Sequence, residues 1–213
     1  MKKLLFILLT FAAMLPWAAN AQETLTVYDE TNTTNNSIPF YGLYADTQGS
    51  SSEFVIPSDQ LAVMEGGQIT AITFYIATPA AVAWTGTYQI YIGEVDATTL
   101  TGITGSSSFT VVSTAQFDAT GTELTITFDS PYTYEGGNLL IGTYLSVAGN
   151  WKTAYFAGVT QTENTGWYRA GPTASGASSK FIPKTTFTYT PGAPISCAKP
   201  ANLAATLTQV TAQ

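Results

Sequence analysis

The chain has 213 residues, and its 7 lysines and arginines against 14 aspartates and glutamates give a formal net charge of −7. Nucleic acids and anionic membranes are bound through basic patches, so this composition makes both poor partners. The absence of histidine excludes serine–histidine and cysteine–histidine catalysis as well as histidine metal sites. A single cysteine, Cys197, leaves no disulfide possible within the chain.

The first residues have the order of a secretory signal. Lys2 and Lys3 precede an uncharged apolar run over 4–13, and small residues lead to an expected cleavage site after Ala21. The apolar run is shorter than the roughly 20 residues that a membrane-spanning helix needs. The sequence therefore predicts a signal peptide over 1–21 and an exported bacterial protein. We expect it to be secreted or held at the cell surface, without membrane insertion.

From residue 22 to residue 190, apolar and polar residues alternate with the period of half-buried antiparallel strands. Short turn signals separate about ten such segments. The segment 138–147 is apolar on both faces, which predicts a central strand. The pattern indicates an all-β antiparallel sandwich or jelly roll, with a closed barrel as the alternative. The expected strands cover residues 24–29, 52–57, 69–77, 87–95, 109–117, 123–130, 138–147, 153–158, 165–170 and 184–191.

Two stretches depart from this alternation. Residues 58–65 are the one candidate helix, because Ser58 or Asp59 could cap its start and Gly66 could end it. An extended edge fits this stretch equally well. Further on, residues 191–196 are rich in proline and glycine, which is typical of a semi-rigid linker.

The last residues, 197–213, read CAKPANLAATLTQVTAQ. They resemble the start of a fibronectin type III domain, with Pro200 followed by Asn202 and Leu203 and then by small and threonine-rich residues. The resemblance implies the truncated first strand of a second domain. It also implies downstream domains in a longer parent protein.

The segment before the linker carries a second resemblance. The stretches SIPFYGLYADTQGSSSEFVIPSDQL, GGQITAITFYI and FDSPYTYEGGNLLIGTYLSVAGNW together resemble an exported adhesin-like β-sandwich module of Gram-negative anaerobes. That module is distantly similar to the cleaved-adhesin domains attached to gingipain-type proteases. The resemblance implies an adhesin-like or carbohydrate-associated module over 22–190, without known catalytic positions. The most recognisable piece of the family is matched here by Pro131, Tyr132, Tyr134, Gly136, Asn138, Leu139, Leu140 and Ile141.

The acidic residues are scattered along the chain, and no pair stands out as the two carboxylates that a glycosidase needs. We therefore expect no enzyme and no cofactor. One interpretation of Asp29 and Glu30, which stand beside amide side chains, is that they bind a structural Ca²⁺ together with Asp46. The alternative is that these residues form a solvated acidic loop.

Aromatic residues offer the remaining chemistry. Trp151, Trp167 and Tyr168 stand in turn-rich surroundings, with Arg169 directly after them. Sugar-binding sites use flat aromatic rings beside polar groups, which suggests these four residues as a ligand site. The alternative is that the tryptophans close an end of the sandwich core.

Together these features predict a non-catalytic extracellular module that binds a surface glycan or a cell-surface protein. One alternative is a structural spacer that positions downstream fibronectin type III domains. A second alternative is a fragment of a carbohydrate-active enzyme.

Overall fold

The computed structural model describes residues 21–192. The predicted signal peptide over 1–21 lies outside the described residues apart from Ala21, and the fibronectin-like tail over 197–213 lies wholly outside them. Only the first two residues of the predicted linker over 191–196 are described. Within residues 21–192, no helix is long and apolar enough to cross a membrane.

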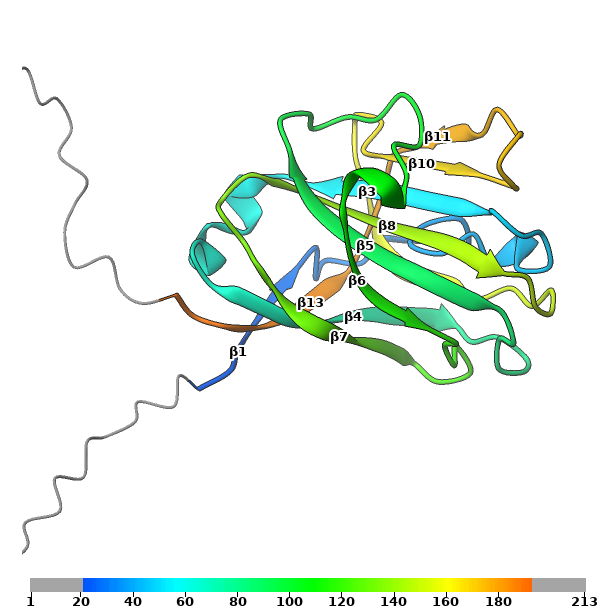
Figure 1. Ribbon diagram of the computed structural model, residues 1–213, viewed down its shortest axis with the longest axis horizontal. Helices are drawn as coiled ribbons and strands as arrows, with labels where there is room; N and C mark the ends of the chain where they lie inside the picture. Colours follow the sequence, from blue (N-terminus) through cyan, green and yellow to red (C-terminus); the bar gives the residue numbers. More distant parts are fainter. Residues whose placement is uncertain (1–20, 193–213) are drawn as a thin grey trace, which may run out of the picture.

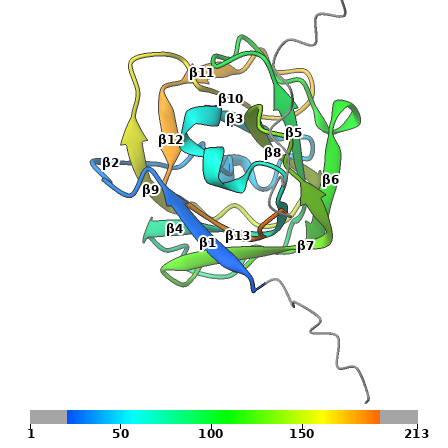
Figure 2. The ribbon, with the colours of Figure 1, turned by 90° about the vertical axis from the view of Figure 1, so that its left-hand side faces the viewer.

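Two antiparallel sheets pack face to face, which confirms the predicted all-β sandwich (Figures 1 and 2). The main path of the seven-stranded sheet runs β1-β13-β4-β9-β12, while β7 pairs with β4 and β2 pairs with β9. These strands are β1 (Glu23–Val27), β2 (Thr33–Asn35), β4 (Gln68–Thr78), β7 (Glu123–Thr133), β9 (Tyr155–Thr160), β12 (Phe181–Pro183) and β13 (Thr185–Thr190).

The second sheet has six strands in the order β11-β10-β3-β8-β5-β6. β8 lies inside this sheet with most of its residues buried, as the apolar character of both its faces predicts. The strands are β3 (Ser51–Ile56), β5 (Thr87–Val95), β6 (Thr110–Ala115), β8 (Asn138–Val147), β10 (Gly166–Arg169) and β11 (Ala177–Ser179). The two ends of the described chain leave from one end of the sandwich, since Glu23 pairs with Tyr189 there (Figure 1).

The core between the sheets is built around an aromatic side chain from a loop. Phe40 is fully buried and contacts Phe74 and Phe156 of the first sheet and Tyr88 of the second. The distances between ring centroids in these three pairs run from 5.1 to 6.2 Å. Burying one ring of this size stabilises a fold by about 1.5–3 kcal/mol. Because side chains alternate along each strand, the apolar side chains of both sheets point into one common core.

A second, smaller cluster lies on the outer face of the six-stranded sheet. It is covered by residues 96–109, the connection between β5 and β6, which we call the strap and which includes the short turn η4 (Ser106–Ser108) (Figure 1). The ring of Tyr91 in β5 stacks on Phe109 at the end of the strap, with centroids 6.1 Å apart. The cluster consists of the buried residues Val55, Tyr91, Leu100 and Leu140.

The candidate helix over 58–65 does not form, and neither does an extended edge. The stretch folds into two 3₁₀ turns, η2 (Ser58–Gln60) and η3 (Ala62–Met64). Leu61 separates them with a φ of −117°, outside the helical range. Leu61 and Met64 are both fully buried. Each turn is therefore held by one buried apolar side chain, and no continuous helix forms.

Candidate functional site

Three tyrosines gather at the end of the sandwich opposite the chain ends. Tyr41 and Tyr44 lie at the 3₁₀ turn η1 (Gly42–Tyr44), and Tyr168 belongs to β10. The centroid of the Tyr41 ring lies 4.9 Å from that of Tyr44 and 4.8 Å from that of Tyr168, and both pairs meet edge to face. Such pairs contribute about 0.5–1.5 kcal/mol beyond burial, so the three rings hold one another in place.

Hydrogen bonds fix the turn that carries these tyrosines. The Ser50 hydroxyl donates to the carbonyl oxygen of Thr47 at 2.7 Å and lies 3.1 Å from that of Tyr44. The backbone N–H of Thr47 donates to the carbonyl oxygen of Tyr44 at 3.0 Å. Loops on a rigid sandwich commonly carry binding residues, and this loop is itself held firmly.

A second loop, which carries Trp151, is attached to the same end. The backbone N–H of Gly149 donates to the carbonyl oxygen of Ala45 at 2.9 Å. The indole N–H of the buried Trp84 donates to the carbonyl oxygen of Lys152 at 2.7 Å. The side chain of Trp151 remains 58% exposed and that of Tyr44 remains 39% exposed. We call the group formed by Tyr41, Tyr44, Trp151 and Tyr168 the aromatic end.

A pocket of about 280 Å³ opens beside the tyrosines. Two of its lining residues are aromatic, one is charged and the rest are small. An aromatic wall with a hydrogen-bonding group at one side is the usual composition of a small ligand site. The lining consists of Tyr41, Tyr168, Arg169, Ala170, Ala174, Gly176 and Ala177.

The four residues predicted as a ligand site do not form a single surface. Trp167 and Tyr168 are neighbours in β10, so their side chains point to opposite faces of the sheet. Trp167 packs against the cluster under the strap, whereas Tyr168 packs against the main core and Tyr41. Tyr168 and Arg169 line the pocket, and Trp151 joins the same end through its loop. Trp167 lies apart from the pocket, and by the same alternation the side chain of Arg169 leaves β10 on the Trp167 face.

Tyr41 and Tyr44 are the contributors that the sequence reasoning missed. They occur in FYGLYADTQG, a turn-rich stretch without strand alternation. The same signal singled out Trp151, and it would have selected these two tyrosines as well. Burial, with a further contribution from the neighbouring Tyr44, raises the pKa of Tyr41 to about 12. Its hydroxyl, which an ordinary tyrosine also keeps protonated at neutral pH, can both donate and accept hydrogen bonds.

Arg169 is the one charged residue among those that line the pocket. Its Nε atom is buried and has no hydrogen-bond partner, and its guanidinium forms no ion pair within residues 21–192. Glu53, which lies on the neighbouring strand β3, is fully buried and already engaged. Its carboxylate accepts from the Tyr91 hydroxyl at 2.7 Å and from the backbone N–H groups of Thr104 and Gly105 at 2.9 and 2.7 Å.

The residues predicted as a Ca²⁺ site are not brought together. Asp29 forms an ion pair with Lys184. Asp46 accepts a hydrogen bond from the hydroxyl of Thr47, at the loop that follows η1. In the described part of the chain, no group of three or more acidic, histidine or cysteine side chains could hold a metal ion. Asp29 and Glu30 instead line a pocket of about 400 Å³ together with Asn32, Gln60 and other residues.

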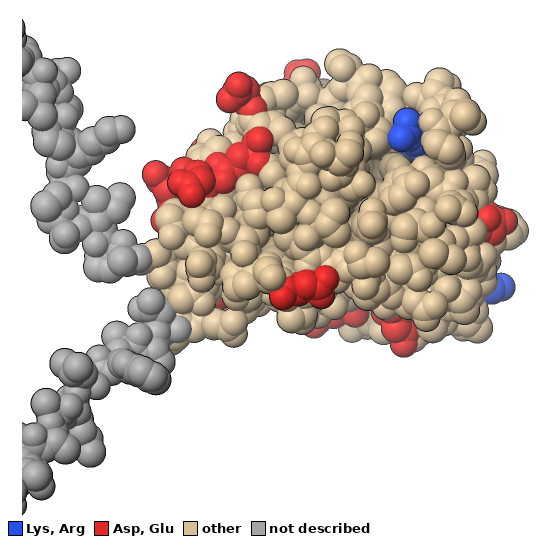
Figure 3. Space-filling model, in the orientation of Figure 1, with Lys and Arg blue, Asp and Glu red and all other residues tan. Residues whose placement is uncertain are grey.

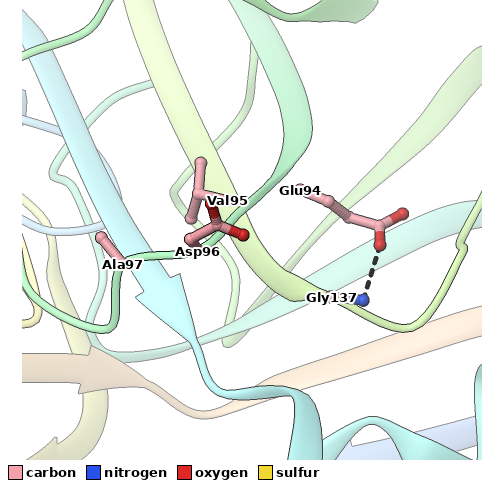
Figure 4. Close-up of a pocket in the computed structure, with 5 residues that line it drawn as sticks. All are labelled: Glu94, Val95, Asp96, Ala97 and Gly137. Atoms are coloured by element: carbon pink, nitrogen blue, oxygen red, sulfur yellow. Dashed lines mark hydrogen bonds between the residues drawn. The ribbon is translucent and has the colours of Figure 1, made fainter.

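A larger hollow, of about 560 Å³, lies where β5 ends beside the turn between β7 and β8 (Figure 4). The Glu94 carboxylate reaches across it and accepts from the backbone N–H groups of Glu135 and Gly137 at 2.7 and 2.6 Å. The side-chain amide of Asn138 donates to the carbonyl oxygen of Asp96 at 3.0 Å. These polar groups hold the turn in place, and no aromatic ring lines the hollow. The aromatic end is therefore the stronger candidate for a ligand site.

No known protein family, curated protein or solved structure significantly matches this chain.

Proposed function

We propose that residues 22–190 form a non-catalytic extracellular module that binds a surface glycan through the aromatic end. The observation that carries the proposal is the Tyr41 ring, which contacts Tyr44 and Tyr168 and lines a pocket of about 280 Å³. A sugar ring has an apolar face and a hydroxylated rim, so it suits aromatic rings that bear hydroxyl groups. A protein partner would need about 800 Å² of complementary surface on each side, far more than this pocket supplies.

Two further features support the parts of the proposal that concern catalysis and location. The chain has no histidine, and the carboxylates of Glu53 and Glu94 are engaged in internal hydrogen bonds. A general acid or base needs a carboxyl group that reaches the substrate, and neither of these two is free to do so. The signal-peptide pattern predicted over 1–21 supports an extracellular location.

A glycan array probed with purified protein tests the proposal. We expect binding by the wild type and its loss in Tyr44→Ala, because an aromatic contact in a small interface contributes about 2 kcal/mol or more. Val63→Ala is the control for an exposed apolar side chain, since Val63 is 68% exposed and belongs to η3. Equal binding by all three proteins would contradict the site. An array without any signal would contradict the function and favour the spacer.

A further inference from the structure

The pocket at the aromatic end differs from the other hollows of the domain in the side chains that line it. Glu94 and Asp96 line the hollow beside the turn between β7 and β8, and carboxylates and amides line the pocket near β1. On the face in Figure 3, the largest group of acidic side chains lies likewise at the left, on the side of the chain ends. Among the described residues, no carboxylate or amide side chain lines the pocket beside the tyrosines.

The one charged residue of this lining has its side chain on the other face of the sheet. Trp167 in β10 pairs with Glu53 in β3, and Arg169, two residues further on, leaves β10 on the same face as Trp167. Tyr168 leaves β10 on the opposite face, where it meets Tyr41. On this face, the lining side chains that can hydrogen-bond to a ligand are therefore the two tyrosines.

Three alanines form the apolar part of the lining, and we call Ala170, Ala174 and Ala177 the alanine wall. Ala177 in β11 pairs with Tyr168 in β10, so the two side chains lie on the same face of this hairpin. Ala170 and Ala174 belong to the loop that joins β10 to β11. An alanine side chain offers neither a hydrogen-bond donor nor an acceptor, so this side of the pocket suits an apolar group of the ligand.

The loop that carries the alanine wall is packed closely against its surroundings. A Cβ atom at Gly49, in the turn that carries the tyrosines, would lie 2.6 Å from the Cδ atom of Pro172. At Gly176, whose φ is +73°, a Cβ atom would lie 2.5 Å from the indole nitrogen of Trp167. These close approaches hold the loop near both of its ends, so a ligand meets a pocket that is already formed.

Resting on the proposed function, we infer that the aromatic end binds a 6-deoxyhexose whose methyl group lies against the alanine wall. Tyr41 and Tyr168 contact the sugar ring and its hydroxyl groups. The pocket of about 280 Å³ suits a single sugar ring. An ordinary hexose would place its C6 hydroxyl against side chains that cannot hydrogen-bond to it, and this loss of hydration disfavours binding. An N-acetyl group also ends in a methyl group, but its amide would lack partners on the wall.

Matched pairs of sugars, each coupled to the same soluble polymer, test this inference. The probes are L-fucose against L-galactose and L-rhamnose against L-mannose. The sugars of each pair differ only at C6, which carries a methyl group in the first and a hydroxymethyl group in the second. We expect wild-type protein to bind at least one deoxy sugar about tenfold more tightly than its partner, because apolar pockets discriminate by roughly this factor. N-acetyl-D-glucosamine against D-glucose is a third pair, which distinguishes an acetamide methyl from a C6 methyl.

Serine substitutions in the alanine wall test where the preference arises. The double variant Ala174→Ser with Ala177→Ser should lose most of the preference, because its hydroxyl groups can bind the C6 hydroxyl of an ordinary hexose. Ala62→Ser is the matched control and should bind like the wild type, since Ala62 is exposed in η3 and lies outside the pocket lining. Thermal unfolding of each variant checks that the fold is kept.

Four results would overturn the inference: equal binding within both C6 pairs, no binding of either deoxy sugar, a preference confined to the third pair, or a double variant that keeps the full preference. Equal binding within the pairs that Tyr44→Ala abolishes would leave the glycan function standing. Only the specificity for deoxy sugars would then fail.

Discussion

The Tyr91 hydroxyl donates a hydrogen bond of 2.7 Å to the carboxylate of Glu53, and both side chains are completely buried. Burial is the main reason that the pKa of Tyr91 lies far above its usual value, and the neighbouring Glu53 adds to this effect. The phenol therefore keeps its proton and remains a donor. Because Glu53 also accepts from two backbone groups of the strap, this pair attaches the strap to the sheet.

Tyr91→Phe tests the attachment of the strap. The variant removes one donor and leaves a buried carboxylate oxygen with one partner fewer, so we expect unfolding free energy to fall by about 1–3 kcal/mol. Denaturant titration measures this loss. Amide hydrogen exchange at Thr104 and Gly105 should accelerate as well. The exposed Tyr155 provides a control, because Tyr155→Phe should change stability by less than about 0.5 kcal/mol. Unchanged stability in Tyr91→Phe would show that the strap is held by other contacts.

Gly142→Ala tests how closely the Tyr91 ring approaches β8. A Cβ atom at position 142 would lie 2.1 Å from carbon atoms of that ring, so the ring must move. Overpacking of this kind costs about 1–3 kcal/mol and occasionally more. Gly102→Ala is the matched control, since a Cβ atom there has no neighbour within 4 Å. Similar melting temperatures for the two variants would contradict the packing of Tyr91 under the strap.

The variants Trp84→Ala and Trp151→Ala test which of these two tryptophans belongs to the core and which lies at the surface. Trp84 is 2% exposed, and its removal should cost about 3–5 kcal/mol of stability. Trp151 is 58% exposed, so its removal should change stability by less than about 0.5 kcal/mol while weakening glycan binding. Melting temperature and glycan retention, measured on both variants, distinguish the two roles. A large drop in melting temperature for Trp151→Ala would show that it belongs to the core.

Alkaline pH should destabilise the domain. Burial is the largest cause that raises the pKa values of Tyr28, Tyr41 and Tyr132 to about 12 from the ordinary value of 10.0. Between pH 10 and about 12, the unfolded chain therefore releases protons that the folded chain keeps. Stability is fully present below pH 10 and falls as the pH rises through this range. Denaturant titration across this range, with phenolate absorbance recorded in parallel, measures this loss of stability. A stability that stayed constant would contradict the expectation.

The sequence predicted the sandwich because its long strands alternate cleanly. Leu124, Ile126 and Phe128 are buried in β7, while the residues between them are exposed, as their period indicates. The strands β2, β11 and β12 were missed, because three residues are too few to establish a period. The 3₁₀ turns at 58–65 depend on the burial of Leu61 and Met64, which local propensity does not reveal.

The candidate site was less predictable, because it depends on contacts between distant segments. Tyr41 meets Tyr168 only once β3 and β10 have paired. The separation of Trp167 from Tyr168, by contrast, follows from strand alternation alone. It was missed because residues 165–170 were interpreted both as a strand and as a turn-rich binding segment. The burial of Glu53 required the strap, whose path depends on tertiary packing.

Two-dimensional NMR of the isotope-labelled domain, titrated with the glycan that gives the strongest array signal, tests whether the aromatic end is the glycan site. We expect shifts of the Trp151 indole signal and of the amide signals of Tyr41, Tyr44 and Arg169 during the titration. The amide signals around Glu94, at the opposite end, should stay in place. Shifts confined to other regions, or no shifts at saturating glycan, would contradict a glycan site at the aromatic end.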